Sequence, residues 1–303
     1  NSHNSKMSEI ATVIATYSRR MRIRLNNDIE VEARIKGKKI KAVCGDIVTT
    51  EPIIGEKDWL ITEIMERTNA LTRPNKSGQT EVLAANIDAL IIVTSVSPIP
   101  DWYIVDRYIC AAEILGIQPI IVFNKIDLLD ENIKINELIE YKKLGLSVVN
   151  FSVKNDKGSK ELLSLISDNQ SIVVGQSGVG KSSIINKLIY GSEQLVGSIS
   201  KSGEGRHTTV NSVMKSINNG GYLIDSPGVR DYLPVLATTS EAQKGFREIT
   251  EFSQFCRFSN CLHLREPKCA VKKAVEDNLI DYRRYESYKR VVNLTSKFSE
   301  KKY

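Results

Sequence analysis

The chain has 303 residues, of which 41% are hydrophobic, and its 42 Lys and Arg against 36 Asp and Glu give a net charge of +6. No apolar run approaches the roughly 18 residues of a membrane-spanning helix and no signal peptide opens the sequence, so we expect a soluble cytoplasmic protein without membrane contacts. At roughly 100–200 residues per domain, the length allows two or three domains.

The first segment, residues 7–70, has the pattern of a small β-barrel. Short apolar and polar runs alternate and are separated by turn signals that contain Gly, Asn and Asp, which indicates about five strands. We therefore predict an all-β OB-fold domain, whose face often binds oligonucleotides. Basic clusters at 19–24 and 34–41 are suited to RNA phosphates, with a solvated strand face as the alternative. Residues 71–85, which open on turn-forming residues, are predicted to be a linker.

From residue 86 the pattern changes to strands that alternate with helices. Buried strands are predicted at 87–93 and 119–123, with a helix at 102–115 between them, which is typical of a parallel sheet covered on both faces. The second strand ends in Asn124-Lys125-Ile126-Asp127, the N-K-x-D pattern with which GTPases read guanine. A fixed carboxylate at Asp127 can accept hydrogen bonds from N1–H and the 2-amino group of guanine, and adenine offers neither donor there.

A second part of the base site is expected one strand later. A helix at 136–143 and a strand at 146–151 lead into a loop that contains Ser152 and Lys154. Its position favours a contact to the guanine O6, and a plain surface turn is the alternative.

Residues 175–182 match the phosphate-loop pattern G-x-x-x-x-G-K-[ST] without a mismatch, between a predicted strand at 171–174 and a predicted helix at 183–190. The loop N–H groups and the positive helix end would cradle phosphate oxygens. Lys181 would reach the β and γ phosphates and act in catalysis by stabilising the transferring charge, and the Ser182 hydroxyl would bind Mg²⁺. A glycine-rich turn that matches by chance is the alternative. The predicted nucleotide-binding residues here are Gly175, Gln176, Ser177, Gly178, Val179, Gly180, Lys181, Ser182 and Ser183.

The polar loop at 191–209 is suited to close around Mg²⁺ and the γ phosphate, with Thr208 or Thr209 as the magnesium ligand. Strands predicted at 210–217 and 222–224 then lead to Asp225-Ser-Pro-Gly228. This D-x-x-G sequence supplies a carboxylate near Mg²⁺ and an N–H group for the γ phosphate.

These elements stand in an unusual order, because the guanine-reading motif precedes the phosphate loop. We therefore predict a circularly permuted α/β P-loop GTPase domain at 86–240. The expected reaction is in-line attack of water on the γ phosphate of GTP, which gives GDP and phosphate without a covalent intermediate.

The last segment, 241–303, contains four metal-ligating residues within fourteen positions, Cys256, Cys261, His263 and Cys269. Three thiols and an imidazole supply the four ligands of one closed structural Zn²⁺ site, with an accidental cluster as the alternative. A helix with several basic residues is predicted at 271–292. After position 256 there are twelve Lys and Arg against six Asp and Glu, so the segment favours structured RNA over a merely solvated helix face.

Taken together, the barrel, the permuted motifs with Gly205-Arg-His-Thr-Thr209 and the zinc spacing resemble the RsgA (YjeQ/YloQ) family of circularly permuted GTPases over nearly the whole chain. The resemblance implies a cytoplasmic factor that acts late in small-subunit maturation, binds the 30S subunit and 16S ribosomal RNA, and hydrolyses GTP faster on that particle. A monomer is expected. A nucleotide-dependent RNA-binding switch with negligible hydrolysis, and a structural zinc protein that binds RNA without nucleotide, are the alternatives.

The group that orients the attacking water is not the usual one. Many GTPases have a glutamine directly after D-x-x-G, but here that residue is Val229, whose apolar side chain cannot orient water. His207, in the loop expected to close over the γ phosphate, is the nearest catalytic candidate, and the resemblance implies the same residue. The alternative is that His207 packs or contacts the ribosome.

Overall fold

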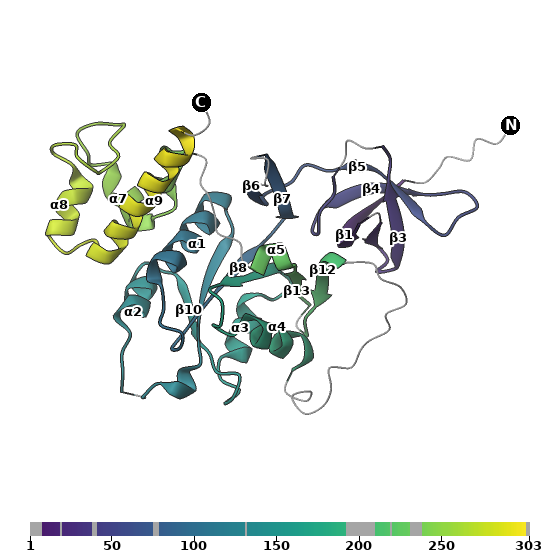
Figure 1. Ribbon diagram of the computed structural model, residues 1–303, viewed down its shortest axis with the longest axis horizontal. Coiled ribbons are helices and arrows are strands. Elements are labelled where there is room, and N and C mark those ends of the chain that lie inside the picture. The colour runs from purple at the N-terminus through teal and green to yellow at the C-terminus, as the bar shows by residue number, and fades with distance from the viewer. Residues whose placement is uncertain are drawn as a thin grey trace. The chain divides into compact units, whose positions relative to one another are not determined.

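The computed structural model describes residues 8–18, 20–37, 41–74, 79–130, 132–191, 210–218, 220–230 and 238–300 (Figure 1). The chain forms two compact units, each assembled from three separate segments: the first comprises Asn1–Asp88, Leu163–Val173 and Ser182–Asp231, and the second Ala89–Leu162, Val174–Lys181 and Tyr232–Tyr303. Within the described ranges, none of the helices combines the length and the apolar character that a membrane crossing requires.

The N-terminal part of the first unit is the predicted five-stranded OB-like barrel, labelled β1 to β5 in Figure 1. Its strands are β1 (Glu9–Tyr17), β2 (Met21–Leu25), β3 (Glu30–Ile35), β4 (Ile47–Pro52) and β5 (Trp59–Ile64). They close in the order β1, β2, β3, β5, β4 and back to β1, with only the β3 and β5 pair parallel. Strand β2 illustrates why the barrel forms, since Met21, Ile23 and Leu25 are buried in its core and the residues between them are more exposed.

Residues 70–85, where the sequence analysis expects a linker from 71 onward, contain a β-hairpin. Strand β6 (Ala70–Pro74) pairs antiparallel with β7 (Thr80–Ala85). Leu71 and Ala84 are fully buried, so both strands contribute apolar side chains to the core. The sequence pattern did not indicate these strands, because the turn-forming residues at 74–78 dominate it.

The first unit also contains a sheet that joins the barrel. Strand β11 (Gln170–Gly175) is parallel to β13 (Tyr222–Asp225), which is antiparallel to β12 (Val210–Ser216). Strand β12 then pairs with the barrel strand β1, with Ala15 opposite Val213 and Thr16 opposite Ser212. Hydrogen-bonded pairing therefore runs without interruption from β11 into the barrel. The helices α4 (Lys181–Tyr190) and α5 (Pro227–Arg230) follow β11 and β13 in the chain.

The second unit is built on three parallel strands in the order β10 (Ser147–Asn150), β9 (Gln118–Asn124), β8 (Ala89–Ser95). Every residue of β8 is buried, as expected of a strand in a covered parallel sheet. The intervening helices α1 (Trp102–Leu115) and α2 (Asn136–Lys143) have the predicted bounds, and η1 (Ile126–Leu128) and α3 (Ser159–Leu165) complete the connections. Helix α1 begins at Trp102 because the Asp101 carboxylate accepts hydrogen bonds from the N–H groups of Tyr103 and Ile104 in the first turn.

The C-terminal part of the second unit is helical, with α6 (Thr239–Lys244), α7 (Arg247–Ser253), α8 (Ala270–Glu276) and α9 (Tyr282–Glu300). The basic helix predicted at 271–292 is therefore wrong, because it is interrupted between α8 and α9. Asn278 has a left-handed φ of 58°, and the N–H groups of Leu279 and Ile280 both donate to the Ala274 carbonyl. This arrangement ends α8 in the way that left-handed caps end helices.

A buried network of charged side chains connects the parallel-sheet part of the second unit with its C-terminal helices. The Arg284 guanidinium on α9 donates to both carboxylate oxygens of Glu248 on α7, at 2.7 and 3.1 Å, and to Asp106 on α1 at 2.9 Å. Asp106 also accepts from Arg283 at 2.6 Å and from the Tyr141 hydroxyl at 2.7 Å. Burial by itself would lower the pKa of Arg284, but the charges of Asp106 and Glu248 outweigh it and raise that pKa.

Candidate nucleotide and metal sites

The phosphate loop lies between the end of β11 and the start of α4, as its motif predicts. A Cβ on Gly175 would collide with the Val93 carbonyl and one on Gly180 with the Asn124 amide, and both glycines have a positive φ, of 143° and 99°. Only glycine fits these two positions. The Lys181 ammonium is nearly buried and donates to the carbonyls of Gly175 and Gln176, at 2.6 and 2.7 Å. The loop therefore wraps around the lysine that would contact the phosphates.

Two residues of the guanine-reading motif hold this loop in place. The Asn124 amide donates to the Val179 carbonyl at 2.9 Å, and the Lys125 ammonium donates to the Gly178 carbonyl at 2.7 Å. Parallel strands bring their carboxyl ends to one edge of a sheet, so β9 and the loop after β11 meet there. The two motifs, about 50 residues apart in the sequence, form one structure.

The orientation of Asp127 is fixed by the second predicted base loop. The Ser152 hydroxyl donates to Asp127 Oδ1 at 2.7 Å and accepts from the Asn155 N–H at 3.1 Å. Ser152 and Lys157 exchange both of their backbone hydrogen bonds, which closes the turn. Lys154 is exposed at the tip of that turn. Sequence reasoning assigned Ser152 to the base, whereas in the structure its side chain positions the carboxylate.

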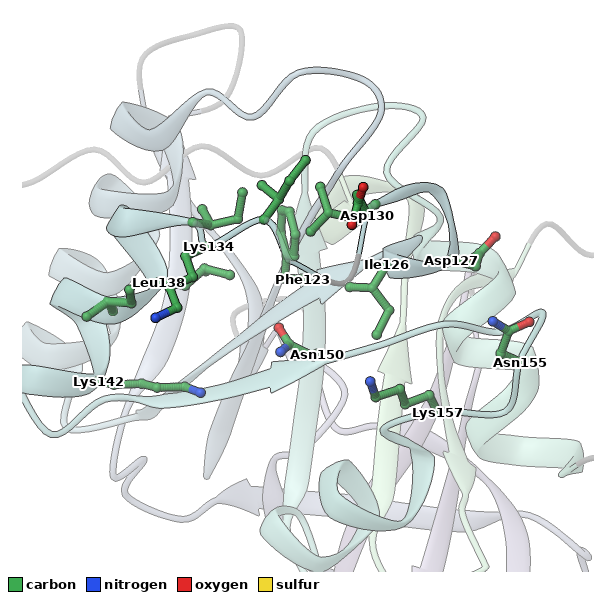
Figure 2. Close-up of a pocket in the computed structure, with 14 residues that line it drawn as sticks. Phe123, Ile126, Asp127, Asp130, Lys134, Leu138, Lys142, Asn150, Asn155 and Lys157 are labelled. Carbon is green, nitrogen blue, oxygen red and sulfur yellow. The ribbon is translucent and has the colours of Figure 1, made fainter.

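A pocket of about 790 Å³ lies beside the base-reading loop, bounded by η1, α2 and the turn at 150–157. Figure 2 shows the Ile126 side chain directed toward this pocket, while the carboxylate of Asp127 points away from it. The apolar third position of the motif thus faces this pocket, and the carboxylate at the fourth position does not.

The remaining predicted nucleotide residues belong to the first unit or lie outside the described residues. Ser182 and Ser183 are exposed in the first turn of α4. Asp225 ends β13 and its carboxylate lies 3.7 Å from the Lys215 ammonium. Val229, which follows D-x-x-G, is 1% exposed, so its side chain is part of the core. His207, Thr208 and Thr209 fall outside the described residues.

The four predicted metal ligands come together as one cluster. The ligand atoms of Cys256, Cys261, His263 and Cys269 all lie within 4.8 Å of one another. His263 Nδ1 is 3.5 Å from the Cys256 sulfur and 3.3 Å from the Cys269 sulfur, and those two sulfurs are 3.8 Å apart. Tetrahedral zinc, with bonds of about 2.3 Å to sulfur and about 2.1 Å to nitrogen, would place sulfurs about 3.8 Å apart and nitrogen about 3.5 Å from sulfur. The donor set therefore fits such an ion.

Thiolate ligands in this cluster would require a bound cation. Burial raises the pKa of the Cys261 thiol to about 12 and raises that of Cys269, and burial lowers the pKa of the His263 imidazole. Neutral imidazole is the form that binds a metal, but thiols must lose their protons to do so. A bound metal ion would supply the positive charge that stabilises the thiolates.

Neighbouring side chains hold the backbone of the ligand loop, and sequence reasoning did not identify them. The Tyr285 hydroxyl of α9 donates to the His263 carbonyl at 2.6 Å, and the Tyr288 hydroxyl donates to the Leu262 carbonyl at 2.9 Å. The Glu266 carboxylate accepts hydrogen bonds from three backbone N–H groups of the same loop, those of Leu262, Leu264 and Arg265. Burial opposes the charge of Glu266, but these backbone donors outweigh it and lower its pKa.

Some basic residues expected to contact RNA are paired within the barrel. Arg22 donates to Glu32 at 2.9 Å, and Arg34 pairs with Glu56. Such exposed pairs are weak, so both arginines can exchange their partner for a phosphate at small cost.

Comparison with known proteins supports the motif assignments. The model of the RsgA GTPase family matches residues 64–233, and a model described as 50S ribosome-binding GTPase matches residues 170–297. The chain is 36% identical to the small ribosomal subunit biogenesis GTPase RsgA of Saccharophagus degradans, over 92% of this chain and 85% of that protein. It is 38% identical to the protein of that name from Haemophilus influenzae, over 98% of this chain and 88% of that protein.

Two solved structures are similar over their whole length. YjeQ from Thermotoga maritima matches with a TM-score of 0.75 and 27% identity, over 95% of this chain and 99% of that one. YloQ, described as a circularly permuted GTPase, matches with a TM-score of 0.76 and 26% identity, over 98% of both chains. The order of the motifs and the arrangement of the elements thus agree with a permuted GTPase.

Proposed function

This chain belongs to the RsgA GTPase family, and from that membership we propose that it hydrolyses GTP to GDP and phosphate in the biogenesis of the small ribosomal subunit. The observation that carries the proposal is the direct bonding of the guanine-reading motif to the phosphate loop through Asn124 and Lys125. A glycine-rich turn that matched by chance would have no reason to be held by the motif that selects the base.

In the proposed reaction the chain's own groups bind and orient the triphosphate for in-line attack by water. Lys181 and the loop N–H groups hold the β and γ phosphates and stabilise the charge that develops during transfer. Ser182 and either Thr208 or Thr209 would hold Mg²⁺, with Thr208 the first candidate, and the bound ion supplies positive charge to the same phosphate oxygens. Asp225 and Gly228 complete the γ-phosphate side.

His207 is the proposed residue that positions the water. The residue after D-x-x-G is Val229, and its side chain is buried, so it takes no part in orienting water. An imidazole in the 191–209 loop would do so once contact with RNA orders that loop around the γ phosphate. GTP turnover by the isolated chain should therefore be slow.

The metal, the RNA partner, the oligomeric state and the location that we propose are those expected from membership of the family. We propose one structural zinc ion held by the cluster of three cysteines and His263, binding to 16S ribosomal RNA in the 30S subunit late in its maturation, a monomeric state and a cytoplasmic location. The proposed parts are an RNA-binding barrel at 7–70, a connection at 71–85, the GTPase domain at 86–240 and the zinc-binding part at 241–303.

The test measures GTP turnover by the wild-type chain and by His207→Ala, each with and without 30S subunits. We expect the subunits to accelerate the wild type by at least about 10-fold, and His207→Ala to bind GTP and subunits normally but to lose that acceleration. If the wild type binds GTP and subunits without turnover in either condition, the chain is a nucleotide-dependent switch. Stimulated turnover of His207→Ala at the wild-type rate would instead show that another group positions the water.

A further inference from the structure

The hairpin formed by β6 and β7 brings an arginine onto the glycine of the D-x-x-G sequence. Strand β7 lies beside α5, the short helix that contains Gly228. Arg73 on β6 stands directly opposite Glu81 on β7, and its Nε donates to the Glu81 carboxylate at 3.1 Å. That hydrogen bond fixes one edge of the guanidinium and directs the rest of the group toward α5.

The guanidinium lies where a side chain on Gly228 would begin. A Cβ placed on Gly228 would be 3.2 Å from Arg73 Nη1 and 3.4 Å from both Cζ and Nη2. Three atoms of a planar group at nearly equal distance mean that its face rests on the glycine. The φ angle of Gly228 is not in the left-handed region, so the backbone would accept other residues there. A side chain at this position would require the exposed Arg73 guanidinium to shift by a few tenths of an ångström.

This contact places a positive charge beside the glycine whose N–H group is expected to distinguish GTP from GDP. The N–H group of the D-x-x-G glycine donates to the γ phosphate, which GDP lacks. We propose that Arg73 is a positioning residue that holds the Gly228 peptide ready for the γ phosphate and thereby sets the preference for GTP over GDP. This inference rests on the proposed function of the same site.

A purely structural role for Arg73 makes a different prediction. The Arg73 and Glu81 side chains are 43% and 29% exposed, and ion pairs with that exposure contribute little to stability. Loss of the pair should therefore leave folding intact, and any effect of Arg73 should be visible in nucleotide binding. The Arg73→Lys variant is informative because it keeps the positive charge but lacks the planar guanidinium.

The experiment measures the affinities of the full-length chain for GDP and for a non-hydrolysable GTP analogue, both with Mg²⁺. For Arg73→Ala we expect about a 10-fold weaker affinity for the analogue and a GDP affinity within about 2-fold of wild type. Arg73→Lys should recover only part of the loss, and Glu81→Gln, which frees the guanidinium to turn, should show a smaller change in the same direction. Arg247→Ala is the matched control, because Arg247 is also 43% exposed and also paired with a glutamate.

An unchanged ratio of the two affinities in Arg73→Ala, or an equal loss of both, would overturn the inference. A wild-type ratio in Arg73→Lys would also overturn it, because charge alone would then be sufficient. Failure of the wild-type chain to bind either nucleotide would contradict the proposed function itself, so the two failures are distinguishable.

Discussion

We propose that the choice of nucleotide depends on Asp127. Its carboxylate is half-buried and is fixed by the Ser152 hydroxyl, which is itself fixed by the Asn155 N–H. A side chain held in this way cannot rotate to suit a different base, so a mismatched base leaves an acceptor unpaired. Specificity for guanine is thus a property of two loops acting together.

Asp127→Asn should weaken GTP binding by about 100-fold or more and improve the binding of xanthosine triphosphate, because the amide can donate where the carboxylate accepted. Competition binding with GTP, XTP and ATP measures this change. Asp130→Asn is the control, since Asp130 is an exposed aspartate three residues further along the same loop. Equal competition by ATP in the wild-type chain would contradict the assignment of the base.

Individual site residues were predictable where a motif fixes both residue type and spacing. The residues from 124 to 127 and from 175 to 182 are of this kind, because close approach of backbone and base leaves few alternatives. Arg73 was not predictable, since no motif includes it and its strand resembled a linker. The hydrogen bonds from Asn124 and Lys125 to the phosphate loop were likewise not predictable from the sequence, because they depend on which strand ends share an edge of the sheet.

Among the elements, those with a strong burial pattern were predicted best. Helices α1 and α2 have the predicted bounds, because their apolar residues recur at helical spacing. For α1, the Asp101 cap begins the helix at the same residue as this pattern. The hairpin of β6 and β7 was missed because the turn-forming residues between its strands dominated the pattern. The prediction of a single basic helix was wrong at Asn278, because the left-handed conformation of this residue leaves no strong signal in the sequence.

The loop that contains the four metal-ligating residues is the element that we expect to depend most on a bound metal ion. It contains Cys256, Cys261, His263 and Cys269, with helix α8 starting directly after the last of them. Cys261→Ser should abolish the binding of one Zn²⁺ per chain and lower the stability of the C-terminal helices, because metal binding supplies folding free energy. Elemental analysis and thermal unfolding measure the two effects.

GTP binding by Cys261→Ser should remain within about 3-fold of wild type, because the contacts of the phosphate loop involve none of these residues. Cys44→Ser provides the control, since Cys44 is also buried but lies in the barrel. Correctly folded wild-type protein without metal would contradict the prediction. So would a full zinc content in Cys261→Ser.

At the scale of the whole molecule, the second unit depends on the buried network around Arg284. This side chain is 1% exposed and Asp106 is fully buried, so the pair has no water to replace a lost partner. Arg284→Met should destabilise the fold by about 3–5 kcal/mol, because it leaves Asp106 and Glu248 buried with less positive charge. The melting temperature should fall by roughly 10 °C.

The matched control is Arg247→Ala. Arg247 also connects α7 with α1, through Glu113 at 2.8 Å, but it is 43% exposed. Its loss should cost less than about 1 kcal/mol. Equal melting temperatures for the two variants would show that the buried network does not stabilise the junction. The order of the motifs predicted a permuted fold from the sequence, but neither this network nor the pairing of β1 with β12 has a sequence pattern that would reveal it.

The pairing of β1 with β12 has a consequence during synthesis of the chain. Ala15 and its partner Val213 are separated by about 200 residues, which a ribosome translates in roughly 10–40 s at about 5–20 residues per second. The barrel strands, which end at Ile64, are translated early in that interval, and the end of β1 from Ala15 to Tyr17 then has β2 on one side but still lacks β12 on the other. An unpaired strand edge is a template for association with other chains. The nascent protein therefore carries a temporary site for aggregation or chaperone binding, which disappears only when the strand after the 191–209 loop emerges.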